Sequence, residues 1–238
     1  MTVAPGGKRA ANRERVRGEL AVAAMHLFDE HGFDTITVDE IADAVGISRR
    51  TLFRHFPTKS DIVFADHPDR IVRLREFLVS ADPDQSPLDV TLASAVDTIP
   101  SFTDPADFYL LRYRLLKLTP ELLVREQAYG VQYTRVLARY LRPELAALGV
   151  EDDAALLGDA LASSIVTVVN RAQRKWAASG GAVDAVAVTS AGVAMLKRAF
   201  GPLVHPNSSS GSTVIVMSKE GISPEDLVQR LESVLKDP

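Results

Sequence analysis

The chain of 238 residues contains no cysteine. This absence excludes a disulfide framework, a thiolate metal site and a cysteine nucleophile. Long apolar runs are also missing, since no run approaches the ~20 residues that span a bilayer. The first twenty residues, MTVAPGGKRAANRERVRGEL, have no apolar core of the length of a signal peptide. We therefore expect a cytoplasmic protein.

No strand pattern is found before residue 200. Apolar residues instead recur at helical spacing over 12–30, and capping residues predict short helices over 38–45, over 49–56 and from residue 59 onward. Longer helices, separated by prolines and a Gly-Gly pair, are expected over 68–80, 87–99, 105–118, 120–141, 152–178 and 182–200. The predicted fold class is all-α.

The chain is predicted to have three parts. A small helical domain occupies 1–64, and a larger helical domain occupies 65–200. The extension over 201–238 begins with a Ser/Gly/Pro linker, continues into a β-branched run at 213–217 and ends in a capped helix. The β-branched run predicts one short strand, which must pair with another segment to satisfy its backbone.

Positive charge is concentrated in two places, although the net charge is −4. Residues 1–17 contain Lys8, Arg9, Arg13, Arg15 and Arg17 against the single acid Glu14. Residues 46–60 contain basic side chains and no acid. Local clusters of this kind matter more for nucleic-acid binding than the average charge of the chain.

The second basic cluster lies in the outline of a helix-turn-helix. Thr37 and Glu40 predict a capping box, Gly46 a turn, and Ser48 the cap of the next helix. Arg49 and Arg50 would then project from the outer face of that second helix, where arginine can bind guanine O6 and N7 together. The alternative is that these arginines form an ordinary solvated helix face.

Residues 37–61, TVDEIADAVGISRRTLFRHFPTKSD, closely resemble the DNA-binding signature of the tetracycline-repressor (TetR) family of bacterial regulators. The resemblance implies a homodimer with an N-terminal DNA-binding module and a C-terminal ligand domain. Carried over by position, it implies DNA contacts by Thr37, Ser48, Arg49, Arg50, Thr51, His55 and Lys59. The outward-facing Phe53, the basic Arg54, and Arg9 and Arg13 of the basic arm are further candidate DNA contacts. Phe53 stands where the family often has tyrosine. His55 either donates to phosphate or caps the helix end.

The segment SRRTLFRHFPTKSDIVF also looks like a subset of that family. Members of this subset include regulators thought to sense acyl-CoA-like ligands, the mycofactocin-system regulators among them. The resemblance therefore implies an elongated amphipathic effector.

Aromatic and polar residues of the larger domain are candidates for the ligand site. Mostly apolar pockets with a few polar groups are typical of such sites. The predicted ligand-binding residues are Phe108, Arg112, Tyr113, Leu116, Tyr129, Tyr133, Val166, Asn170 and Trp176. Core packing is the alternative for each aromatic residue, and solvent exposure is the alternative for arginine. By resemblance, the helices over 152–178 and 182–200 form the dimer interface.

An enzyme is not predicted. The sequence has no phosphate-binding glycine loop and no HExxH, and its histidines lack the spacing of metal ligands. Asp66 and His67 precede Pro68 and predict a helix start. We expect no cofactor, no metal and no membrane partner. The predicted function is a ligand-responsive repressor that binds a palindromic operator. The alternative is a DNA-binding regulator without a small-molecule effector, controlled by a protein that docks on the C-terminal extension.

Overall fold

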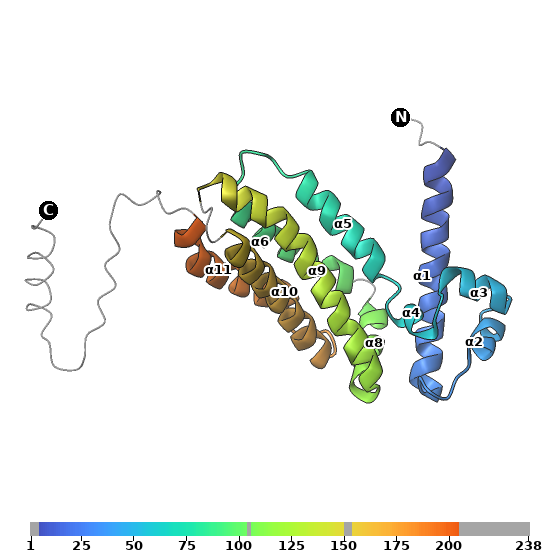
Figure 1. The fold of residues 1–238 in the computed structure, drawn as a ribbon. Coiled ribbons are helices and arrows are strands. Elements are labelled where there is room, and N and C mark those ends of the chain that lie inside the picture. The colour runs from blue at the N-terminus through green and yellow to red at the C-terminus, as the bar shows by residue number, and fades with distance from the viewer. Residues whose placement is uncertain (1–4, 104–105, 150–153, 205–238) are drawn as a thin grey trace, which may run out of the picture. The chain divides into compact units, whose positions relative to one another are not determined.

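The computed structural model describes residues 5–103, 106–149 and 154–204, and these ranges contain helices and no strand (Figure 1). The all-α prediction is confirmed for them. The helices are α1 (Pro5–His31), α2 (Val38–Ala44), α3 (Arg49–His55), α4 (Lys59–Val63), α5 (His67–Val79), α6 (Pro87–Asp97), α7 (Pro100–Thr103), α8 (Ala106–Leu118), α9 (Pro120–Ala147), α10 (Ala154–Ala178) and α11 (Ala185–Val204).

Most helix starts follow the predicted capping residues. The Thr37 hydroxyl accepts the Glu40 N–H while the Glu40 carboxylate accepts the Thr37 N–H, a complete capping box. Ser48 caps α3 by accepting the N–H of Thr51, and Thr58 forms a second box with Asp61 at α4. Each cap satisfies backbone N–H groups that have no partner within the helix.

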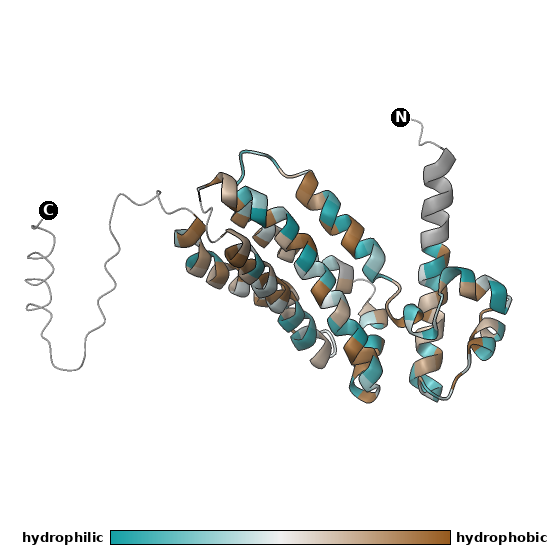
Figure 2. Cartoon of the chain, in the orientation of Figure 1, coloured by the Kyte–Doolittle hydropathy of each residue, from teal (hydrophilic) through white to brown (hydrophobic). Residues whose placement is uncertain are grey.

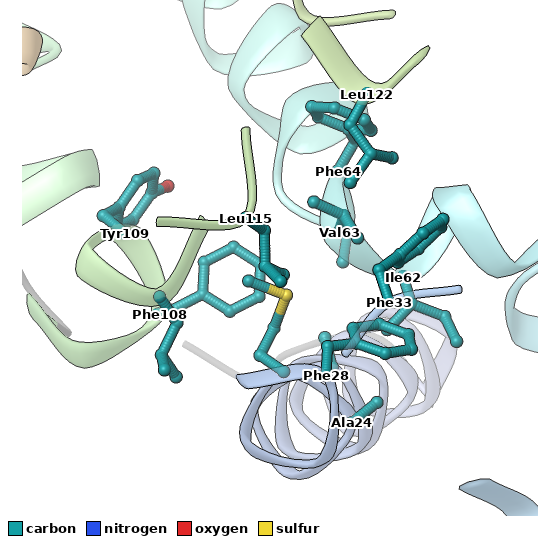
Figure 3. Packing of buried hydrophobic residues seen from close by; sticks show 14 of the residues in the cluster. Ala24, Phe28, Phe33, Ile62, Val63, Phe64, Phe108, Tyr109, Leu115 and Leu122 are labelled. Atoms are coloured by element: carbon teal, nitrogen blue, oxygen red, sulfur yellow. The ribbon is translucent and has the colours of Figure 1, made fainter. Parts of the chain in front are cut away.

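One apolar cluster joins α1, α2, α3 and α4 to α8 and the start of α9. Figure 3 shows Phe28 and Phe33 near Ile62, with Phe108 and Tyr109 on the opposite side of the labelled residues. The rings of Phe28 and Phe33 meet edge to face, with their centroids 5.1 Å apart. Because this cluster includes residues on both sides of position 64, the small predicted domain packs directly on the larger one.

A second apolar cluster lies among α5, α6, α9, α10 and α11. The hydropathy pattern is amphipathic on α5 and α9, and α11 is more uniformly apolar (Figure 2). Gly192 of α11 allows α10 and α11 to pack closely, because a Cβ added at this position would lie only 2.6 Å from Val168 Cγ1 of α10. These helices position the cavity described below.

Some helix bounds differ from the sequence-based expectation. The first helix begins at Pro5 rather than near residue 12. The expected end of α9 before Pro143 is wrong, because the helix continues through Pro143 to Ala147. Pro143 is exposed, so the hydrogen bond that proline removes is lost on a solvent-facing side of the helix. The short helix α7 was not expected.

The described residues all fall within one compact unit. The domain boundary at residue 64 stays a prediction. The predicted strand at 213–217 and the terminal helix lie outside the described residues. None of the described helices has the length and apolar character needed to cross a membrane.

Candidate nucleic-acid interface and effector cavity

Helices α2 and α3 meet at a tight turn that fixes the exposed face of α3. Gly46 has a φ of 72°, a conformation that side chains other than glycine disfavour. The N–H of Ile47 donates to the Ala42 carbonyl at 3.0 Å, which closes the turn. Leu52 and Phe56 are buried on the inner face of α3, so Arg50 and Arg54 lie exposed on the outer face.

Arg49 is held by neighbours within the same motif. Its Nη1 atom donates to Asp39 Oδ2 at 2.8 Å, and its guanidinium lies 5.3 Å from the centre of the Phe53 ring. Both Arg49 and Asp39 are exposed, so the pair contributes little to stability. The pair does fix the orientation of the Arg49 guanidinium on the face of α3 that is predicted to contact DNA.

The Lys59 side chain is partly buried, although a contact with phosphate requires only an exposed ammonium group. Its ammonium donates to the Ile36 carbonyl at 2.7 Å and lies 4.5 Å from the centre of the Phe33 ring. Partial burial lowers the pKa of Lys59. One of its N–H donors is therefore already used within the protein.

Thr37 and His55 also have contacts within the motif. The Glu40 carboxylate accepts from both the backbone N–H and the hydroxyl of Thr37, and the N–H bond holds the pKa of Glu40 below its ordinary value. His55 is half-buried, and its ring centre lies 6.3 Å from that of Phe56. The backbone of Arg9 and Arg13 lies in α1, and their side chains are outside the described residues.

A buried ionic cluster lies where α5 begins. Asp66 accepts hydrogen bonds from Arg112 at 2.6 Å, from the Tyr109 hydroxyl and, at 3.4 Å, from Arg70. Arg112 is only 1% exposed. Burial alone would raise the pKa of Asp66, but Arg112, His67 and Arg70 hold it well below its usual range. Asp66 is therefore a carboxylate that links α5 to α8.

His67 continues this cluster toward α9. Its Nδ1 atom shares a hydrogen bond with the Tyr133 hydroxyl at 2.9 Å, and its ring stacks on Tyr129 with centroids 4.2 Å apart. Its Nε2 atom lies 3.4 Å from Glu126 Oε2. Burial lowers the pKa of His67 despite the nearby carboxylates of Asp66 and Glu126. The ring is therefore held mainly in its neutral form at neutral pH.

A cavity of about 80 Å³ adjoins the cluster, between α5, α6, α9 and α10. Its polar end carries His67, Arg70, Glu126 and Tyr133. The rest of the wall exposes mainly apolar surface, from Leu74, Ala95, Leu137, Ile165, Val166 and Val169. It also includes the polar residues Arg73, Ser94, Asp97, Thr98, Asn170 and Gln173. A cavity that is apolar along most of its wall and polar at one end suits an amphipathic molecule.

Comparison with known proteins identifies the family of the helix-turn-helix. Residues 20–65 match the family described as bacterial regulatory proteins, tetR family. The chain carries a TetR-family DNA-binding domain.

Similarity to named relatives extends beyond this TetR-family domain. The chain is 31% identical over 123 residues to a protein described as the mycofactocin biosynthesis transcriptional regulator MftR of Mycobacterium tuberculosis, a match that covers 51% of this chain and 62% of that protein. It is 37% identical over 73 residues to the transcriptional activator FasR of Mycolicibacterium smegmatis, covering 28% of this chain and 33% of that one. The chain thus matches under two thirds of the length of either relative.

Solved structures share the fold of this chain. Thermus thermophilus FadR, a TetR-family repressor solved with lauroyl-CoA, aligns with a TM-score of 0.51 and 21% identity over 87% of this chain and 99% of that chain. FadR of Bacillus subtilis, solved with stearoyl-CoA, aligns with a TM-score of 0.52 and 17% identity over 74% of this chain and 95% of that chain. The relatives and structures named here are transcription regulators.

The cavity contains some of the predicted ligand-binding residues. Tyr133, Val166 and Asn170 line it. The other predicted residues lie outside its wall, and they are Phe108, Arg112, Tyr113, Leu116, Tyr129 and Trp176. Phe108 and Trp176 are buried in the first apolar cluster, and Tyr113, Leu116 and Tyr129 pack against it. Their roles as ligand contacts stay predictions.

Sequence reasoning missed the contribution of α5 and α6 to the wall. His67 and Arg70 of α5, with Glu126 of α9, form the polar end. The sequence carried one usable signal, because Asp66 and Arg70 are four residues apart and lie on one face of the helix that His67 begins. Which neighbouring helix faces them was not readable from that spacing.

Proposed function

We propose that the protein is a ligand-responsive transcription regulator that binds a palindromic operator as a homodimer. One observation carries the proposal: the helix that follows the TetR-family domain lines the cavity with its first turn. His67 and Arg70 belong to that turn, and Asp66 directly precedes it. A molecule in the cavity would therefore contact the element that leads into the DNA-binding domain.

The proposed DNA contact is the outer face of α3. Arg49 and Arg50 would read base edges in the major groove, with Ser48, Thr51, Phe53 and Arg54 beside them. Thr37, His55 and Lys59 would contact the phosphate backbone, and Arg9 and Arg13 of the arm would contact the adjacent groove or backbone. Lys59 would do so with the donors that Ile36 leaves available.

Coupling between the two regions would pass through ion pairs. Arg112 of α8 binds Asp66, and Arg114 of the same helix donates to both carboxylate oxygens of Asp29 in α1 at 2.9 and 2.8 Å. Arg125 of α9 donates to Asp61 of α4. A ligand that shifts α5 or α9 would move these anchors, and release of DNA is the proposed result. The FasR name shows that relatives also include activators.

The effector is proposed to be small and amphipathic. The FadR structures in complex with lauroyl-CoA and stearoyl-CoA support an acyl compound. Sites for drug-sized ligands measure roughly 300–1,000 Å³, whereas this cavity measures about 80 Å³. A whole acyl-CoA would therefore require α5 and α9 to separate, while a short amphipathic molecule would not.

The proposed dimer interface uses α10 and α11. Both helices present large apolar side chains to solvent: Leu156, Val186, Met195 and Leu203 are each more than half exposed. Burying this surface against a second copy would stabilise a dimer through the hydrophobic effect. Two copies related by a two-fold axis would then offer two α3 helices to one palindrome.

The test is selection of duplexes from a random DNA pool, followed by titration of the enriched sequence. An operator with two-fold symmetry should be enriched. Arg50→Ala should then weaken operator binding by about 1–3 kcal/mol and relax base preference at one position of each half-site. Arg75→Ala, which removes an exposed arginine from α5, is the control and should leave affinity unchanged. Failure to enrich any duplex would refute the proposed function.

A further inference from the structure

The polar end of the cavity contains buried atoms that lack hydrogen-bond partners among the described residues. One is Arg70 Nε, while His67 Nε2 and Glu126 Oε2 face each other at 3.4 Å without a well-aligned hydrogen bond, and all three side chains line the cavity. The hydrogen bonds that Arg70 does make, to Asp66 and Thr98, are both long at 3.4 Å. A buried polar group without a partner destabilises the empty cavity, so a ligand that supplies partners would recover that free energy.

Arg70 is the group that selects the ligand. Its ion-pair partner Asp66 lies 3.4 Å away and is already bound at 2.6 Å by Arg112 and also accepts from Tyr109. Arg70 is only 6% exposed, so water screens its charge poorly. A planar guanidinium with spare donors binds a carboxylate better than any neutral oxygen.

The charges around His67 balance before such a ligand arrives. Asp66 and Arg70 lie beside it in the chain, Tyr109 and Arg112 face it from α8, and Glu126, Tyr129 and Tyr133 face it from α9. The two carboxylates offset the two guanidinium groups while His67 is neutral. An incoming anion would leave one negative charge unpaired in this buried cluster.

Protonation of His67 would restore the balance. Its Nε2 atom lies 3.4 Å from Glu126 Oε2, and its Nδ1 atom lies 2.9 Å from the Tyr133 hydroxyl, so both N–H groups of the protonated ring would face an oxygen that can accept. Glu126 is a poorer proton acceptor, because His67 and the arginines outweigh its burial and lower its pKa to about 2.

We propose that the cavity binds a small monocarboxylate with a short apolar tail, that Arg70 holds its carboxylate group, and that His67 takes up a proton on binding. The inference rests on the proposed effector site, and it is independent of the proposed DNA contact. Leu74, Leu137, Ile165 and Val169 provide the apolar wall for the tail.

The test is calorimetric titration of the full chain, without DNA, using ligands that share one carbon chain. Hexanoate is the probe. Hexanol and hexylamine replace its carboxylate with a hydroxyl or an amine, and norleucine keeps the carboxylate and adds an α-ammonium group. Hexanoate should bind at least tenfold more tightly than hexanol or hexylamine. Its Kd should tighten by up to about tenfold per pH unit from pH 8 to 6, and titrations in phosphate and Tris should reveal uptake of about one proton.

Matched variants assign the two roles. Arg70→Gln should lose the preference for hexanoate over hexanol, whereas Arg75→Gln, on the same helix but outside the cavity wall, should retain it. His67→Gln should bind hexanoate with neither pH dependence nor proton uptake. This second variant keeps the test decisive if Arg70→Gln does not fold.

Several outcomes would overturn the inference while leaving the proposed regulator intact. One is equal binding of hexanol and hexanoate, and another is absence of hexanoate binding at millimolar concentration. Tighter binding of norleucine without proton uptake would mean that Glu126 holds an ammonium group and that His67 stays neutral. Operator selection, measured separately, tests the proposed function itself.

Discussion

Asp66 shows how one residue can connect two parts of a protein. It lies between α4 and α5, and its carboxylate receives donors from α5 and α8. Removing one partner of a buried ion pair costs about 3–5 kcal/mol, because the other charge is left uncompensated. Replacing Arg112 would therefore affect folding as well as any signal, so conservative changes at His67 are more informative.

The buried His67 should make stability depend on pH. Its pKa is lowered in the folded chain, so below the ordinary value of 6.5 the unfolded chain binds a proton that the folded chain does not. The free energy of unfolding should therefore fall as pH decreases from 7 toward 5, by at most about 1.4 kcal/mol per pH unit from this group. Asp66 and Glu126, whose pKa values are also lowered, extend the loss below pH 4.5.

Urea denaturation at several pH values measures this effect. His67→Gln should flatten the slope between pH 7 and 5 and leave the loss below pH 4.5 in place. An unchanged slope in the variant would show that another group causes the dependence.

At the scale of elements, the sequence predicts helix caps and turns well, and it predicts the contacts between helices poorly. The capping boxes at Thr37 and Thr58 and the turn at Gly46 were predictable, because each is a short-range interaction between named residues. The continuation of α9 through Pro143 was not, because tertiary packing outweighs the local cost of proline. The cavity wall was only partly predicted for the same reason: Tyr133 and Asn170 were singled out, but the facing helices α5 and α6 were not.

The crossing of α10 and α11 depends on a single missing side chain. Gly192→Ala would place a methyl group 2.6 Å from Val168 Cγ1, so either the helices separate or Val168 shifts. We expect a loss of about 1–3 kcal/mol, as for other overpacked sites. Thermal or urea unfolding measures it.

Gly18→Ala is the matched control. Gly18 lies within α1, and an added Cβ there meets nothing within 4 Å. Alanine should stabilise that helix by roughly 0.5–1 kcal/mol. If Gly192→Ala is as stabilising as the control, the crossing is looser than the contact with Val168 indicates.

At the scale of the whole molecule, the proposed switch is a linkage between two binding reactions. A ligand can shift DNA binding only by the difference in its affinity for the two states, and the coupling is typically 1–3 kcal/mol. Linkage also requires that operator DNA weaken ligand binding by the same factor.

This reciprocity can be measured with hexanoate and the selected operator. We expect hexanoate to bind about 5–150-fold more weakly when operator is present, which is the range that such coupling energies give. An unrelated duplex of the same length is the control and should have little effect. Equal hexanoate affinities with and without operator would mean that the cavity does not control DNA binding.

The ion pair between Arg49 and Asp39 has a further consequence for how such a regulator would find its operator. In the proposed complex, any phosphate that approaches Arg49 competes with a carboxylate already 2.8 Å away. Non-specific affinity comes almost entirely from such charge contacts, so in the proposed complex Asp39 would lower the affinity of the protein for arbitrary DNA. A guanine edge offers Arg49 two acceptors in return, whereas a passing phosphate merely exchanges one anion for another. In the proposed complex Asp39 would thus shorten the time spent at each wrong site and leave more of the protein free to search the genome.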